Sequence, residues 1–224
     1  MNYLYLLIEV IMVFLLMILF YRVGKKEGLF IYIALMSSIL SIVMFKVFDI
    51  LSFQINFGLP IIMGIFTANN IIIQRYGLDE IKRIIYTFGF SYIFTMIIMN
   101  LVSLMTSSEY NIISNNSFDQ LFGYNLVNLR CFVGGFISIG FMLWFNGEVY
   151  YYIRRDKNKL IFSNIGSILI IQFIESMIFV VICYLGLYDI ILIFGMIVIR
   201  YLLKVVIGVV GLLPVYLLVK MKDK

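Results

Sequence analysis

Gln172, Glu175 and Ser176 interrupt an otherwise apolar stretch, SILIIQFIESMIFVVICYLG, near the C-terminal end of the chain. On a helix these three side chains fall within an arc of about 100°, so they form one polar stripe. An ionised carboxylate in lipid costs roughly 3 kcal/mol or more, and it normally faces a partner, a cavity or water. The stripe therefore predicts that this helical face meets charged or hydrogen-bonding groups from elsewhere in the chain.

The next apolar run supplies candidate partners for Glu175. Arg200 and Lys204 are four residues apart, so they share one face of a helix, and Gly208 and Gly211 continue that face. If the two runs are neighbouring antiparallel helices, Glu175 and Arg200 lie at similar depths, each roughly 15 Å from the outer end. We expect Glu175 to pair with Arg200 or Lys204. The pair can join two helices or line a polar pocket, and both interpretations stay open.

Another apolar run, 126–151, carries Arg130 about one helical turn from its outer end. A side chain there can extend to the membrane interface or meet a ligand or an acidic partner. Gly134 and Ser138 follow at spacing four, which is more typical of close helix packing than of a binding site.

The composition defines the setting for these residues. The chain has 224 residues, of which 63% are hydrophobic and 13% are charged, against about half and about a quarter in a soluble domain. This predicts an all-α, polytopic membrane helix bundle. We attribute the net charge of +5 to basic cytoplasmic loops rather than to a nucleic-acid partner.

Several classes of chemistry are disfavoured by the absence of their residues. The chain has no histidine and no GxxxxGK[ST] loop, which argues against a serine–histidine pair, a HExxH zinc site and a P-loop ATPase. Cys131 and Cys183 lie in apolar runs without the spacing of a zinc site. We therefore expect no metal, no cofactor and no enzymatic activity.

Seven apolar runs are candidates for membrane-spanning helices, which need roughly 20 residues each. The third run is short and carries Asn69 and Asn70. No separate soluble domain is expected, so residues 1–224 form a single membrane domain. The predicted spans are 3–21, 29–51, 57–73, 81–105, 126–151, 160–187 and 190–219.

Lysine and arginine residues concentrate in alternate connections between these runs. The other connections contain Glu109, Asp119 and Asp189 and neither lysine nor arginine, and the Ser/Asn-rich segment 106–120 is the one sizeable outer loop. The positive-inside rule then predicts a cytoplasmic (inner) membrane protein with its N-terminus outside and its C-terminus in the cytoplasm. The basic residues are Arg22, Lys25 and Lys26; Arg75, Lys82 and Arg83; Arg154, Arg155, Lys157 and Lys159; and Lys220, Lys222 and Lys224.

Five separated stretches of the chain carry a resemblance to one family: VFDILSFQINFG, GIFTANNIIIQRYGLDEIKR, LRCFVGGFISIGFMLWFNGEVYYYIRR, SILIIQFIESMIFVVICYLG and YLLKVVIGVVGLLPVYLLVK. Together they resemble the VUT or YhhQ-type family of queuosine precursor transporters, and VFDILSFQINFG fits the segment before its third span. GIFTANNIIIQRYGLDEIKR is similar to its third-span block, and LRCFVGGFISIGFMLWFNGEVYYYIRR to its arginine-initiated helix. SILIIQFIESMIFVVICYLG resembles its Ser…Ser-Gln-x-x-Asp-Ser/Thr…Phe helix. YLLKVVIGVVGLLPVYLLVK resembles its last helix, with a lysine and a later proline. The order and spacing agree along nearly the whole chain.

The resemblance implies a fold, a function and partners. The fold would be a six-helix core over 27–224, similar to the substrate-binding components of energy-coupling factor vitamin transporters, with an additional helix over 1–26. The function would be uptake of 7-deazaguanine precursors of the tRNA nucleoside queuosine. The partners would be a purine-like base and the lipid bilayer, while the oligomeric state stays open.

The resemblance also implies a set of site residues. The family's membrane acids fall on Asn70, Gln74, Asn146 and Glu175, so three acids are replaced by amides. An amide cannot bind a proton or balance a cation, which leaves substrate identity and proton coupling open. The full implied substrate-binding set is Asn70, Gln74, Arg130, Asn146, Gln172, Glu175, Ser176 and Lys204, with Arg200 as a charge partner.

Glu175 and Gln172 suit the edge of a deazaguanine. A carboxylate can accept hydrogen bonds from the exocyclic amine and the ring N–H, and an amide can meet the carbonyl. The leading hypothesis is a transporter for queuosine precursors. The alternatives are a substrate-binding subunit of a multi-chain vitamin or nucleobase uptake complex, and a diverged membrane protein that transports nothing.

Overall fold

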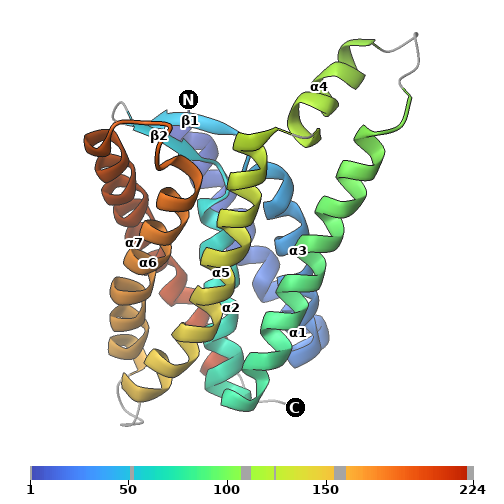
Figure 1. Cartoon of the computed structure of the whole chain (residues 1–224). Helices are drawn as coiled ribbons and strands as arrows, with labels where there is room; N and C mark the ends of the chain where they lie inside the picture. Colours follow the sequence, from blue (N-terminus) through green and yellow to red (C-terminus); the bar gives the residue numbers. More distant parts are fainter. Residues whose placement is uncertain (1, 51–52, 107–111, 124, 154–159, 221–224) are drawn as a thin grey trace.

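The computed structural model describes residues 2–50, 53–106, 112–123, 125–153 and 160–220, and these residues form a bundle of helices (Figure 1). The predicted all-α membrane bundle is confirmed as a class. Several residues of the expected charge pattern lie outside the described part: Glu109, Arg154, Arg155, Lys157, Lys159, Lys222, Lys224 and the side chain of Lys220. The elements are α1 (Asn2–Val43), β1 (Val47–Ile50), β2 (Phe53–Asn56), α2 (Leu59–Tyr76), a 3-10 turn (Leu78–Glu80), α3 (Ile81–Ser103), α4 (Ile112–Phe122), α5 (Leu126–Ile153), α6 (Leu160–Tyr184) and α7 (Ile190–Lys220).

Helix α1 consists of two antiparallel limbs joined by a tight turn. The break falls at Lys25, whose backbone is non-helical with φ 49° and ψ −122°. Beyond the break the chain folds back on itself, and the Tyr32 hydroxyl donates a hydrogen bond to the Val13 carbonyl oxygen at 3.2 Å. The two limbs occupy the first two predicted spans. That residues 1–26 are an addition to a six-helix core remains a prediction.

The predicted end of the second span is wrong. The helix ends at Val43 rather than at residue 51, and an antiparallel hairpin follows in which Val47 pairs with Asn56 and Ile50 with Phe53. The β-branched and aromatic residues of this segment fit a short strand. Apolar content alone does not separate a short strand from the end of a buried helix.

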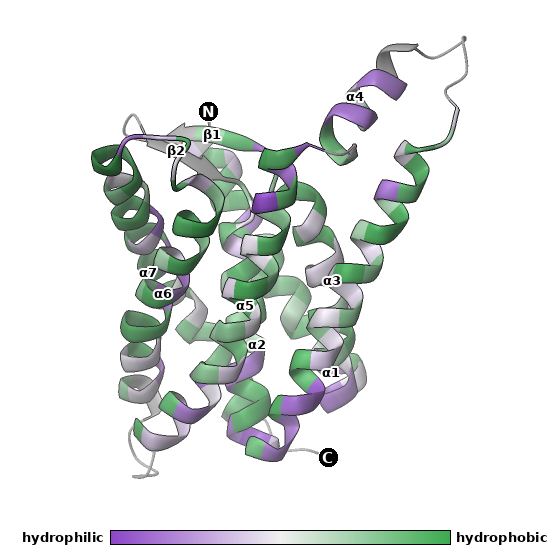
Figure 2. Cartoon of the chain, in the orientation of Figure 1, coloured by the Kyte–Doolittle hydropathy of each residue, from purple (hydrophilic) through white to green (hydrophobic). Residues whose placement is uncertain are grey.

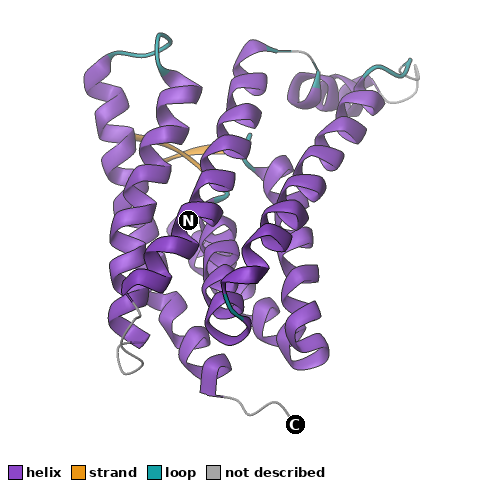
Figure 3. Ribbon diagram, turned by 60° about the horizontal axis from the view of Figure 1, so that its bottom comes forward, coloured by secondary structure: helices purple, strands orange, loops and turns teal. Residues whose placement is uncertain are grey.

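The chain runs back and forth along the bundle, and its two ends lie at opposite ends of the molecule (Figure 1). The helices lie side by side, and the small hairpin crosses the bundle (Figure 3). Five helical segments of the described chain are long and apolar enough to cross a membrane. They are Tyr3–Val43, Leu78–Ser103, Leu126–Ile153, Phe162–Tyr184 and Ile190–Val219.

Helix α2 is not one of those five segments because it carries polar residues such as Asn69 and Asn70, and its burial explains why it can carry them. Every residue from Leu59 to Ile73 is buried, because α1, α5 and α7 pack around it. A helix enclosed by other helices does not need an apolar outer face, so it can carry Asn69 and Asn70 inside the bundle.

Hydrophobic residues cover most of the helical lengths, whereas hydrophilic residues gather at the end where α2 turns into α3 and on α4 at the opposite end (Figure 2). Two ion pairs link that turn to the break in α1. Lys26 Nζ lies 2.6 Å from Glu80 Oε1, and Arg83 pairs with Glu27. The basic residues expected around the first and third connections therefore lie at one end of the bundle.

The Ser/Asn-rich segment 106–120 is partly helical rather than a simple loop. Helix α4 lies at the end of the bundle opposite the turn between α2 and α3, where the basic residues of the first and third connections gather (Figure 1). We call the end with these basic residues the basic end. The amide of Asn128 in α5 donates hydrogen bonds to the carbonyl oxygens of Gln120 and Leu121, at 3.0 and 2.9 Å. These bonds satisfy carbonyl groups at the C-terminal end of α4 and attach it to α5.

The α1 hairpin generates a first prediction, at Gly28. A Cβ atom there would lie 2.0 Å from the backbone oxygen of Phe20, so the two limbs would have to separate. We expect Gly28→Ala to lower the free energy of unfolding in detergent by about 3 kcal/mol. The matched control is Gly140→Ala in α5, where a Cβ meets nothing within 4 Å. A Gly28 variant as stable as this control would contradict the tight turn.

Candidate functional site

The candidate site lies where α5 and α6 pack together. Small residues permit the close approach: a Cβ on Gly134 would lie 2.9 Å from Cys183 Sγ. Below that contact α5 presents a buried stripe at spacing four, and α6 presents a facing set of buried polar residues. The α5 stripe is Ser138, Met142, Asn146 and Tyr150, and the α6 set is Asn164, Ser167, Gln172, Glu175 and Ser176.

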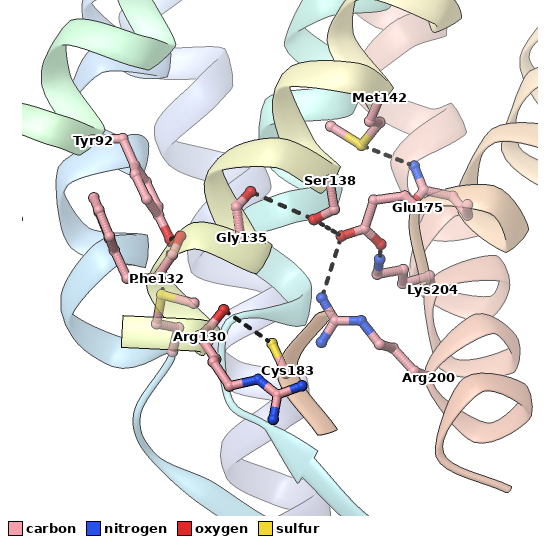
Figure 4. Close-up of polar contacts among 12 residues, drawn as sticks. Tyr92, Arg130, Phe132, Gly135, Ser138, Met142, Glu175, Cys183, Arg200 and Lys204 are labelled. Carbon is pink, nitrogen blue, oxygen red and sulfur yellow. Dashed lines mark hydrogen bonds and ion pairs between the residues drawn. The ribbon is translucent and has the colours of Figure 1, made fainter. Parts of the chain in front are cut away.

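Glu175 forms the centre of a buried charge cluster (Figure 4). Its Oε1 accepts hydrogen bonds from Ser138 Oγ at 3.1 Å and from Arg200 Nη2 at 3.3 Å. Its Oε2 forms an ion pair with Lys204 Nζ. The side chains of Glu175 and Lys204 have no exposed surface, and that of Arg200 is 4% exposed.

The pairing expected from the sequence is therefore present with both cations. Arg200 also lies over the ring of Phe179, with its guanidinium carbon 3.9 Å from the ring centroid, a cation–π contact. Because both carboxylate oxygens of Glu175 are engaged, this carboxylate has little capacity left for a ligand in the present conformation.

Gln172 and Ser176 flank Glu175 on α6, and both are fully buried. The Gln172 amide nitrogen lies 3.5 Å from Met142 Sδ, a weak hydrogen bond. Within the described part of the chain, Gln172 Oε1 and Ser176 Oγ have no hydrogen-bond partner. Both are acceptors available to a ligand or to water.

A second polar group, nearer the basic end, is a directed chain of hydrogen bonds between α2, α5 and α6. Asn146 Nδ2 donates to Asn70 Oδ1 at 2.6 Å, and Asn70 Nδ2 donates to Asn164 Oδ1 at 2.9 Å. Asn164 Nδ2 then donates to Tyr150 OH at 3.3 Å, which donates to Gln74 Oε1 at 2.6 Å. We call these five residues the amide chain.

Arg130 lies apart from both groups. Its Nε donates to the carbonyl oxygen of Ile182 at 3.0 Å, and its Nη2 donates to that of Leu185 at 2.7 Å. Cations and donors at this position satisfy the last carbonyl groups of a helix. In this structure Arg130 caps α6, and Figure 4 shows it at the far side of Cys183 from the charge cluster.

The structure thus groups the predicted site residues into the charge cluster, the amide chain and the separate Arg130. Sequence reasoning missed Asn69, Asn164 and Tyr150 as site residues. The signal for Tyr150 was its place four residues after Asn146 on the α5 stripe, but it was one of 16 tyrosines. Asn164 lay eleven residues before Glu175, three helical turns along the same face.

The bundle is closed around these groups. A cavity of about 10 Å³ lies beside Arg200, between Tyr92, Gly135 and Phe179, and it is about the size of one water molecule. A larger hollow of about 280 Å³ opens elsewhere, between α3, α4 and α5, and its lining is mainly apolar. A base-sized ligand would therefore need helix movement to reach Glu175.

The fold and the buried polar groups are those of a multi-pass helical membrane protein. The chain belongs to a family described as "Putative vitamin uptake transporter", whose model matches residues 56–219. It is 24% identical over 211 residues to a "Probable queuosine precursor transporter" of Bacillus subtilis (strain 168), covering 93% of this chain and 90% of that protein. No solved structure gives a significant match.

The charge cluster generates a second prediction. Glu175→Gln would leave Arg200 and Lys204 buried without their carboxylate, so we expect a loss of about 3–5 kcal/mol in the free energy of unfolding. Glu175→Gln with Lys204→Gln should be less destabilised than Glu175→Gln alone, because one buried cation is removed with the anion. Equilibrium unfolding in mixed detergent micelles measures the free energy of unfolding of the single and the double variant.

The control for this pair of variants is Glu148→Gln, an exposed carboxylate on α5, for which we expect a change within about 0.5 kcal/mol. Equal losses for the Glu175 and Glu148 variants would contradict the cluster.

Proposed function

We propose that this protein imports a 7-deazaguanine-type base across the cytoplasmic membrane. Seven helical segments would cross the membrane, with the N-terminus outside and the C-terminus in the cytoplasm. The family and the name of the Bacillus subtilis relative support the transport of a small molecule of this kind. All of the candidate site residues fall within the matched segment 56–219.

The observation that carries this proposal is the burial of Glu175 between Arg200 and Lys204. Burying ionised groups is expensive, and a well-packed apolar core would hold the helices together at least as well. Ionisable groups kept inside a membrane bundle usually line the path of a substrate or an ion. The cluster joins α5, α6 and α7, so a change in its pairing moves these helices relative to one another.

The closed bundle corresponds to a state between two open ones. The amide chain joins α2 to α5 and α6 on the side toward the basic end, so it closes the path from the site to the cytoplasm. Neutral amide and hydroxyl bonds contribute about 1 kcal/mol each, which makes such a closure reversible. Opening toward the cytoplasm would break the chain while the cluster near Glu175 holds the base.

Queuosine rescue tests the proposed function. The protein is expressed in a bacterial host that lacks both precursor synthesis and its own transporter but keeps the enzymes for the later steps of queuosine synthesis. The host receives 7-cyano- or 7-aminomethyl-7-deazaguanine at low concentration. We expect queuosine in its tRNA when this protein is expressed. We expect Lys204→Met to abolish it, because Glu175 loses one of its two cations, and Glu148→Gln to retain it. Absence of queuosine, with the wild-type protein shown in the membrane, would contradict the proposal.

Membrane orientation gives a separate prediction. Asn116→Cys in α4 and Asp79→Cys in the turn after α2 place exposed thiols at opposite ends of the bundle. An impermeant maleimide should label the Asn116 variant in whole cells and the Asp79 variant only after the cells are broken. The native Cys131 and Cys183 are buried and serve as the unlabelled background. The reverse pattern would overturn the proposed orientation.

A further inference from the structure

We propose that one turn of α5, residues 142–146, carries a subsite of amide oxygens that accepts N–H donors of the transported base, and that Asn69 is a specificity-determining residue of this subsite. The inference rests on the proposed function and deepens it. It assigns the recognition of the base's donor edge to residues other than Glu175, and it makes the substrate class a base with an exocyclic 2-amino group.

Three fully buried side chains bring unpaired acceptors to this turn. Asn69 Oδ1, Asn146 Oδ1 and Gln172 Oε1 have no hydrogen-bond partner among the described residues, and all three side chains have no exposed surface. Asn69 Nδ2 donates to the Leu143 carbonyl oxygen at 3.3 Å, and Gln172 Nε2 contacts Met142 Sδ. Helices α2, α5 and α6 therefore each contribute one amide oxygen around the same turn.

The amide nitrogens of these residues are already used, and this sets the chemistry of the subsite. Each nitrogen donates to a protein atom, at Leu143, Asn70 or Met142, whereas each oxygen remains without a donor. A buried acceptor without a partner is unfavourable, and an incoming N–H group removes that cost. The subsite therefore favours a ligand edge rich in N–H donors and disfavours one that presents ring acceptors.

A base with a 2-amino group and an adjacent ring N–H presents such an edge. The amine and the ring nitrogen together offer three N–H groups side by side, whereas a base without the 2-amino group offers one. Glu175 cannot fill this role in the present conformation, because Ser138, Arg200 and Lys204 occupy its oxygens. Glu175 lies about one helical turn from Gln172 on α6, so its cations would meet the carbonyl oxygen of a base whose 2-amino edge faces Gln172.

The experiment measures equilibrium binding to the full chain in lipid nanodiscs. The probes are 7-cyano-7-deazaguanine and its analogue that lacks the 2-amino group. We expect the wild-type protein to bind the 2-amino base at least about tenfold more tightly. Asn69→Leu should weaken binding of the 2-amino base by about tenfold and leave the analogue nearly unchanged, so that the preference disappears.

The matched control is Asn100→Leu, a half-buried asparagine of α3 whose amide bonds the Met96 carbonyl oxygen of its own helix. This variant should keep both the affinity and the preference. Equal wild-type affinities for the two probes would overturn the subsite while the proposed function stands, and so would an Asn69 variant that keeps the preference. If the wild-type protein binds neither probe, the proposed function fails and the subsite fails with it.

Discussion

The burial of one carboxylate between two cations is the constraint on which the rest of the structure depends. Removing Glu175, Arg200 and Lys204 from water is tolerable only if their polar atoms meet one another, and this requires α5, α6 and α7 to be held in one register. The close packing of Gly134 against Cys183 places Ser138 beside Glu175. The enclosure of α2 by α1, α5 and α7 completes the wall that keeps lipid away from these charges.

Between the charge cluster and the basic end of the bundle, neutral amide groups join the helices. Amides can donate and accept at once, so Asn146, Asn70 and Asn164 form a continuous chain without a net charge. Acids at the same positions would repel one another or require protons, and the amides avoid both. Because an amide neither binds nor releases a proton near neutral pH, any proton coupling of transport would depend on Glu175 rather than on the amide chain.

The architecture was largely predictable, because apolar length and the position of lysine and arginine residues depend on the membrane itself. The helices fell close to the expected runs, apart from the end of the second span and the helix α4 within the expected outer loop. That segment, Val47–Ile50, forms a strand whose apolar content resembles a helix end. The pairing of Glu175 with Arg200 and Lys204 was also predictable, since helical spacing places charges on a face and antiparallel packing matches their depths.

The detailed partners were not predictable, because they depend on how the helices rotate against each other. Arg130 has the type and depth of a ligand-binding residue, yet it caps α6 through Ile182 and Leu185. Asn164 and Tyr150 looked like ordinary members of apolar helices, and the packing of α2 against α5 and α6 brings Asn70 and Gln74 to them. Asn69 was visible as a polar residue of the third span, but the contact of its amide with Leu143 depends on the packing of α2 against α5.

A structure with 7-cyano-7-deazaguanine bound would test the proposed site most directly. We expect the base to lie between α2, α5 and α6, with its 2-amino edge toward Asn69 and Gln172 and its carbonyl oxygen toward the cations around Glu175. The amide chain would be intact or broken according to the side on which the bundle is open. Density for the base in the apolar hollow between α3, α4 and α5, with the charge cluster unchanged, would contradict the proposed site.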